Sequence, residues 1–70
     1  MTEYYKKQLG LRVNNLKMIR QDYHITQKRI ADRMGLTQSA VSQFECGKID
    51  SYIMIIHYED CLRHLIEEIE

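Results

Sequence analysis

The apolar residues of this chain recur at three- and four-residue steps, which is the spacing of one face of an α-helix. In the first third of the chain, one such stripe predicts a helix over residues 3–22, with Gly10 as a weak point inside it. The members of the stripe are Tyr5, Leu9, Val13, Leu16 and Ile19. The sequence DYHI, which follows from position 22, breaks the pattern, so we expect the helix to end there.

A short second helix is predicted over residues 27–34. Thr26 precedes it and is a typical N-cap, because its hydroxyl can accept a hydrogen bond from a free backbone N–H of the first turn. Gly35 follows it and is a typical terminator, because glycine adopts left-handed backbone angles without steric cost. The residues expected to face the core are Ile30, Ala31 and Met34.

A third helix over residues 38–46 repeats this arrangement, with Thr37 as its N-cap and Gly47 as its terminator. Its apolar side consists of Ala40, Val41 and Phe44. Its other side carries amides and hydroxyls in place of the usual Lys, Glu and Arg, and such groups can read base edges in the major groove of DNA. The candidates for base reading are Gln38, Ser39, Ser42 and Gln43. The alternative is a solvated face that lacks charge by chance.

A fourth helix is expected to start at Asp50 or Ser51 and to run to residue 69. Residues 52–56 are apolar almost all round, so we expect them to be covered on more than one side, by the core and by a second copy of the chain. A stripe of Tyr58, Leu62, Leu65 and Ile69 continues along this helix. The predicted dimer interface comprises Ile53, Met54, Ile56, Leu65 and Ile69. A β-strand over YIMIIHY is the alternative.

The start of the second helix carries two cations, Lys28 and Arg29. Positive charge in a first turn opposes the helix dipole, which costs a few tenths of a kcal/mol. The arrangement becomes favourable when a phosphate binds there, because the cations and the free N–H groups then share one anion. Solvent screening of the penalty is the alternative.

Two helices joined by a short turn with Gly form the helix-turn-helix arrangement.

The charge is unevenly distributed, although the net charge is zero. Residues 1–49 contain nine basic residues (Lys and Arg) and four acidic ones (Asp and Glu). Residues 50–70 contain one basic residue and six acidic ones. A basic front could approach an anion such as DNA while an acidic back faces away; two ordinary solvated surfaces are the alternative. With no membrane span, no secretory segment and no close-spaced cysteine motif, we expect a cytoplasmic protein without a cofactor.

The segment TQKRIADRMGLTQSAVSQFECGK, residues 26–48, resembles the helix-turn-helix of the lambda-repressor-like family, which includes the Cro proteins, phage repressors and many small bacterial regulators. The matching positions are Thr26, Gln27, Ile30, Ala31, Met34, Gly35, Leu36, Thr37, Val41, Ser42, Glu45 and Gly47. The resemblance covers about residues 12–62. It implies a compact all-α domain of four to five helices with a helix-turn-helix at 26–47. We therefore expect a single domain over residues 1–70, in which a helical extension at 1–11 precedes the family pattern and the C-terminal helix at 51–69 serves for dimerisation.

The resemblance also implies roles for single residues. Gln27 would contact phosphate and brace the third helix, and Thr37 and the backbone near Lys48 would contact phosphate. Arg20 and Glu45 would form a pair that ties the first helix to the third. The chain departs from the family pattern at Cys46, where a polar residue is usual, and in the extension before residue 12.

Two further features leave alternatives open. His57, Cys61 and His64 have a helical spacing that could hold zinc, but they lack a fourth ligand, and polar residues beside an apolar stripe would look the same. Cys61 could also form an intermolecular disulfide, which a reducing compartment disfavours. In the extension, Tyr4, Tyr5, Lys6 and Lys7 could lie on DNA, pack on a partner or simply lengthen the first helix.

Taken together, these patterns predict a sequence-specific regulator of transcription, a Cro-like repressor that binds a palindromic operator on double-stranded DNA as a homodimer. A controller or antitoxin-type regulator would share the same chemistry. A module that sequesters another regulator through the apolar fourth helix is a different class. Seventy residues leave no room for an effector-binding domain, so we expect no small-molecule effector. No nucleophile–base pair, phosphate loop or paired carboxylates indicate an enzyme.

Overall fold

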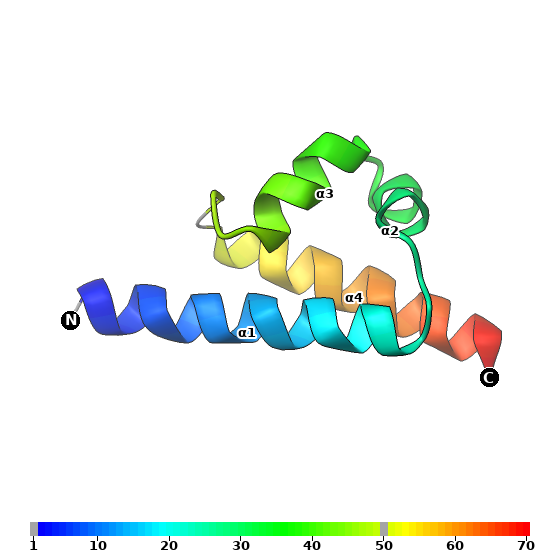
Figure 1. Ribbon diagram of the computed structural model, residues 1–70, viewed down its shortest axis with the longest axis horizontal. Coiled ribbons are helices and arrows are strands. Elements are labelled where there is room, and N and C mark those ends of the chain that lie inside the picture. Colours follow the sequence, from blue (N-terminus) through cyan, green and yellow to red (C-terminus); the bar gives the residue numbers. More distant parts are fainter. Residues whose placement is uncertain (1, 50) are drawn as a thin grey trace.

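The four predicted helices are all present in the computed structural model of the chain, which describes residues 2–49 and 51–70, with side chains from residue 7 onward (Figure 1). They are α1 (Thr2–Asp22), α2 (Gln27–Met34), α3 (Gln38–Glu45) and α4 (Tyr52–Ile69). The all-α prediction is therefore confirmed for these residues, and the strand alternative for YIMIIHY is wrong because that segment is helical. Asp50 and the side chains of Tyr4, Tyr5 and Lys6 lie outside the described part.

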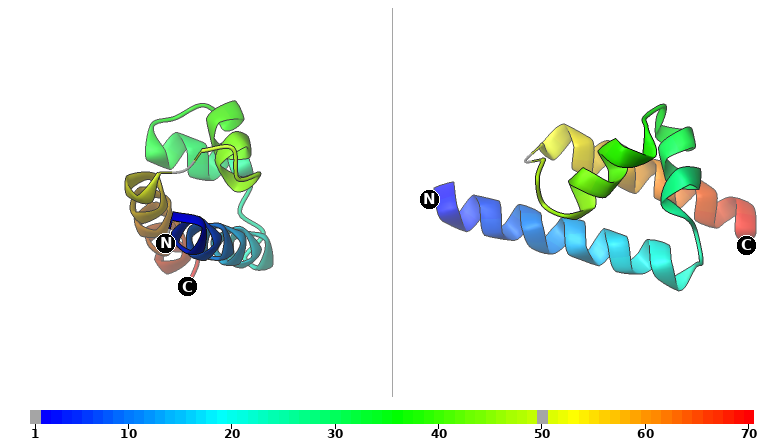
Figure 2. Two further views of the ribbon diagram at one scale, coloured as in Figure 1. Left: turned by 90° about the vertical axis from the view of Figure 1, so that its left-hand side faces the viewer. Right: turned by 45° about the horizontal axis from the view of Figure 1, so that its top comes forward.

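The helices form two layers (Figure 2). The two long helices, α1 and α4, lie side by side and run in the same direction (Figures 1 and 2). The two short helices, α2 and α3, lie together on one side of this pair; α2 packs on α4, and α3 packs on α1. The opposite side of the α1–α4 pair is left uncovered by the short helices.

Local sequence signals explain where the helices begin. The Thr26 hydroxyl accepts a hydrogen bond from the Arg29 N–H at 3.1 Å, and the Thr37 hydroxyl accepts one from Ala40 N–H at 3.1 Å. At α4 the Ser51 hydroxyl accepts a hydrogen bond from the Met54 N–H at 3.2 Å, so Ser51 is the N-cap. These side-chain caps thereby satisfy one free N–H at the starts of α2, α3 and α4.

The helix ends depend on left-handed backbone. Gly35 ends α2 with φ of 75°, as predicted. The third helix ends one residue earlier than expected, at Glu45, with Cys46 as the C-cap and Gly47 at φ 81° just beyond it. Where α1 ends, His24 adopts φ of 58°, a conformation that favours glycine. It is held by the Ile25 N–H, which donates to the Arg20 carbonyl at 3.1 Å.

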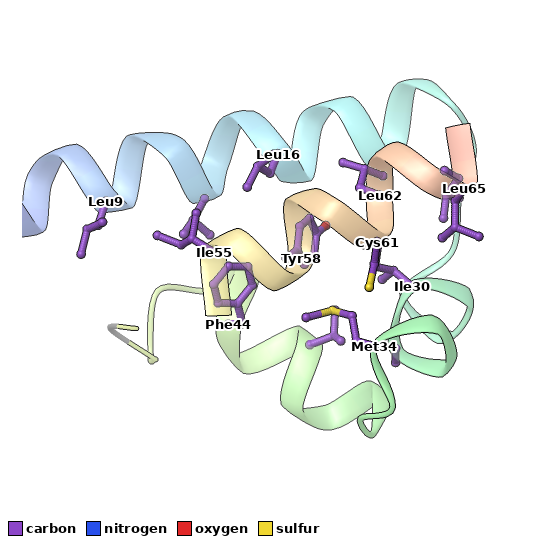
Figure 3. Close-up of a cluster of buried hydrophobic side chains, with 14 residues drawn as sticks. Leu9, Leu16, Ile30, Met34, Phe44, Ile55, Tyr58, Cys61, Leu62 and Leu65 are labelled. Atoms are coloured by element: carbon purple, nitrogen blue, oxygen red, sulfur yellow. The ribbon is translucent and has the colours of Figure 1, made fainter. Parts of the chain in front are cut away.

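All four helices contribute to one hydrophobic core (Figure 3). Its largest fully enclosed side chains are Ile25, Ile30, Val41, Phe44, Ile55 and Tyr58. The rings of Phe44 and Tyr58 lie 5.1 Å apart, which joins α3 to α4 at the centre. The residues predicted to face inward from α2 are buried, and so are Val41 and Phe44 of α3, while Ala40 is half-buried.

Two predictions about apolar stripes are wrong. Ile19 is 39% exposed, because the buried edge of α1 continues from Leu16 to Arg20 instead. Leu65 is only 4% exposed and packs in the core of its own chain, so it cannot belong to the predicted dimer interface. The physical reason is that α4 turns one face onto α1 and α2, and Leu65 lies on that face.

Candidate nucleic-acid interface

The outward face of α3 presents uncharged polar groups. Gln38, Ser39 and Gln43 are exposed, and Ser42 is half-buried. The Gln43 amide donates to the Ser39 hydroxyl at 3.5 Å along this face. On the inward side Val41 and Phe44 are completely enclosed, so the helix is anchored by its apolar face while the polar face stays open.

Cations lie at the start of α2 and just beyond the end of α3. Lys28 and Arg29 are exposed in the first turn of α2, which has no acidic residue to offset them. Lys28 is 3.8 Å from Asp32, but both side chains are more than 70% exposed, so this pair contributes little. Lys48 is exposed in the turn after α3. An anion near these residues would meet positive charge and open backbone groups.

A buried carboxylate connects α3 to the rest of the molecule. Glu45, on α3, accepts hydrogen bonds from Arg20 Nε at 2.7 Å and Arg20 Nη2 at 3.0 Å, a two-pronged contact with α1. It also accepts from Gln27 Nε2 of α2 at 3.0 Å and from the Tyr58 hydroxyl of α4 at 2.6 Å. One carboxylate thus receives donors from all three other helices.

The remaining buried hydrogen-bonding groups of these residues also have partners. Arg20 Nη1 donates to the Ile25 carbonyl at 2.6 Å. Among the described residues, no buried side-chain nitrogen or oxygen lacks a hydrogen-bond partner. Full satisfaction matters because an unpaired buried charge would cost several kcal/mol, of order 3–5. We therefore regard this Glu45 cluster, defined as Arg20, Gln27, Glu45 and Tyr58, as the element that fixes the orientation of α3.

The electrostatics of the Glu45 cluster follow from its geometry. Burial alone would raise the pKa of Glu45, but the hydrogen bonds from Arg20, Tyr58 and Gln27 outweigh burial and hold the pKa below its ordinary value. Burial and the hydrogen bond to the Glu45 carboxylate both raise the pKa of Tyr58. The phenol therefore remains protonated and donates to the carboxylate.

The Glu45 cluster contains two contacts that the sequence analysis expected and one that it did not. The predicted contact between Arg20 and Glu45 is present, and so is the predicted bracing of α3 by Gln27. Tyr58 was predicted only as a member of an apolar stripe. A tyrosine at a core position usually has a hydroxyl partner, and this was the available signal for its second role.

The acidic residues of α4 are mostly involved in surface ion pairs. Glu59 pairs with Arg12 at 3.0 Å, Glu68 with Arg33 at 3.0 Å, and Asp60 with Arg63 at 2.7 Å. These pairs neutralise one cation each of α1, α2 and α4. Lys28, Arg29 and Lys48 make no close ion pair with the other described residues apart from the loose Lys28–Asp32 contact.

His57 and Cys61 take part in packing at the end of α2. His57 Nε2 lies 3.0 Å from the Met34 carbonyl, and the Cys61 thiol is buried beside the Arg33 carbonyl. Burial, together with the nearby Asp60 carboxylate, raises the pKa of the Cys61 thiol. Its burial is unfavourable for an intermolecular disulfide. No group of three metal-ligating side chains converges in the described part of the chain.

Comparison with known proteins agrees with this geometry. The chain matches the Helix-turn-helix family model HTH_3 over residues 16–50, half of its length. No curated protein and no solved structure shows a significant match to the chain. Within the described residues, no helix combines the length and the apolar character that crossing a bilayer requires. The matched family comprises DNA-binding domains of transcription regulators and is not an enzyme family. The chain therefore belongs to the lambda-repressor-like, XRE-type helix-turn-helix family.

Proposed function

We propose that this DNA-binding protein is a sequence-specific, Cro-like repressor that acts in the cytoplasm as a homodimer on a palindromic operator. The observation that carries the proposal is the open, uncharged face of α3, held in place by the Glu45 cluster and flanked by cations. α3 would enter the major groove, where glutamine can donate to and accept from adenine.

Base reading is assigned to one surface and phosphate contact to another. The base-reading residues would be Gln38, Ser39, Ser42 and Gln43. The phosphate contacts would be Gln27, Lys28, Arg29, Thr37 and Lys48. Of these, Gln27 is half-buried and bonded to Glu45, so a phosphate contact there would couple binding of the DNA backbone to the placement of α3.

Dimerisation would use the exposed apolar residues at the start of α4. Ile53 is 79% exposed and Ile56 is 48% exposed, and both lie close in sequence to the turn that follows α3. Met54 would contribute less, because it is partly buried against the core. Ile69 is exposed at the far end of α4, some four turns away, and would contribute only if the two copies pair along the whole helix.

The test is selection of bound fragments from a random pool of double-stranded DNA. The proposal predicts two inverted half-sites whose centres lie about one helical turn, roughly 34 Å, apart. Enrichment of a single half-site would contradict the dimer, and no enrichment at all would contradict sequence-specific reading. Inverted half-sites would also fit a controller or antitoxin-type regulator, which shares this site and differs in the genes it controls.

A second candidate function is favoured by the exposed Ile53 and Ile56. In that case this patch would bind and sequester another regulator. A gel-shift assay separates the two functions, because a sequestering module has no need of the salt-sensitive DNA affinity that phosphate contacts give.

A further inference from the structure

The side of the α1–α4 pair that faces away from the short helices contains an apolar groove. It has a volume of about 400 Å³ and is lined by residues of α1 and α4 and by Glu70, which follows α4, with none from α2 or α3. Its lining residues are Leu16, Ile19, Glu59, Leu62, Arg63, Ile66, Glu67 and Glu70. Figure 2 shows that α1 and α4 meet on the side opposite α2 and α3. The groove therefore lies away from the base-reading face.

The apolar part of the groove is only partly covered by its own chain. Leu16 and Leu62 are buried and form the floor, whereas Ile19 is 39% exposed and Ile66 is half-buried. Ile19 stands where the sequence pattern predicts a core residue, yet no side chain of the described part covers it fully. A second apolar surface placed in the groove would remove both isoleucines from water.

The charges around the groove are predominantly negative at one end. Glu59 and Arg63 are already engaged in pairs with Arg12 and Asp60. Glu67 and Glu70 are exposed and form no ion pair with other described residues. A positively charged group is therefore the one that would pair with the carboxylates at this end of the groove.

Helix polarity adds to this negative charge. Because α1 and α4 run in the same direction, their carboxyl-terminal ends, which carry partial negative charge, lie at the same end of the molecule (Figure 1). The last turn of α4 contains no basic residue and places carboxylates where the helix dipole disfavours them. Both features favour an occupant with positive charge at this end.

We propose that the groove binds an amphipathic helix of a partner protein, with an apolar stripe that covers Ile19 and Ile66 and with Lys or Arg side chains that meet Glu67 and Glu70. Since the groove faces away from α3, the partner and DNA would bind at the same time. This goes beyond DNA binding and does not depend on the proposed repressor function.

The experiment uses a synthetic, fluorescein-labelled helical peptide with a Leu stripe flanked by Lys, and a comparison peptide in which Glu replaces Lys. Fluorescence anisotropy with the full chain should show binding of the Lys peptide only. Ile19→Asn and Glu67→Lys should each weaken it about tenfold. The matched controls are Leu11→Asn, at a half-exposed leucine elsewhere on α1, and Asp32→Lys, the same reversal of charge on α2. Both should bind the peptide as the wild type does.

Three results would overturn the proposal. The first is equal binding of the Glu peptide, and the second is unchanged peptide affinity in both groove variants. The third is a wild-type dimer that Ile19→Asn converts to a monomer in sedimentation equilibrium, because a second copy of the chain would then cover the groove. Circular dichroism of each variant confirms that it is folded, and Glu67→Lys, at an exposed position, remains informative if Ile19→Asn unfolds. DNA affinity of Ile19→Asn should equal that of the wild type, which separates failure of this proposal from failure of DNA binding.

Discussion

The Tyr58 hydroxyl lies 2.6 Å from a carboxylate oxygen of Glu45, so a hydrogen bond inside the core ties α4 to α3. The same two helices are joined by the adjacent rings of Phe44 and Tyr58. The position of the base-reading face thus depends on a buried polar contact as well as on apolar packing, and each can be tested separately.

Tyr58→Phe removes this hydrogen bond and keeps the ring. We expect the free energy of unfolding to fall by about 1.5–3 kcal/mol, the usual contribution of a hydrogen bond to a charged group. Urea denaturation measures it, with Tyr23→Phe as the control at a partly exposed tyrosine on the surface. A loss of unfolding free energy no larger than that of the control would mean that the hydrogen bond from Tyr58 to Glu45 does not stabilise the fold.

The low pKa of Glu45 predicts a specific dependence of stability on pH. Its folded pKa lies below the unfolded value of about 4.5, so its contribution is fully present above that pH and is lost as the pH falls through the folded pKa. The reference is Arg20→Met/Glu45→Leu, which removes both charges and avoids leaving one unpaired. Stability of the wild type should fall more steeply than that of the reference below about pH 4.5, and parallel curves would contradict the assignment.

Much of the fold could be predicted because its signals are local. Thr26, Gly35 and Thr37 act through hydrogen bonds and backbone angles within a few residues, and the bounds of α2 agree with the prediction. Whether an apolar residue is covered depends on distant helices. That is why the sequence pattern misplaced Ile19, which lies on a stripe of the right spacing but is 39% exposed, and assigned to an interface Leu65, which is buried in the core of its own chain.

The candidate site likewise has a part that local sequence predicts and a part that depends on contacts between distant residues. The uncharged face of α3 can be recognised from the spacing of its own residues. The convergence of three helices on Glu45 cannot be derived from spacing, because it depends on contacts between positions as far apart as Arg20 and Glu45. The resemblance to the family supplied that pair, and only the structure added Tyr58 and the Ile25 carbonyl.

Phosphate contact at the start of α2 should show in the salt dependence of binding. Lys28→Ala and Arg29→Ala should weaken binding to all DNA sequences similarly and should each reduce the slope of log K against log salt by about 1. Arg63→Ala, which removes a cation of α4 paired with Asp60, is the control and should leave the slope unchanged. An unaltered slope in both α2 variants would place the phosphate contacts elsewhere.

Ile53→Asp tests the proposed dimer. Because Ile53 is 79% exposed, the variant should fold as a monomer and lose specific binding, since one recognition helix reads only a few base pairs. Sedimentation equilibrium at micromolar concentrations measures the association, and Leu11→Asp, at a half-exposed leucine on α1, is the control. A variant dimer as tight as the wild type would exclude Ile53 from the interface.

The central claim is that the uncharged face of α3 reads base sequence, and the most direct test is the affinity of Gln38→Ala and Gln43→Ala for the selected DNA site and for random DNA. We expect each substitution to cost about 1–3 kcal/mol on the selected site and almost nothing on random DNA, because the lost contacts are to base edges. Wild-type affinity of both variants for the selected site would show that this face is not the reader.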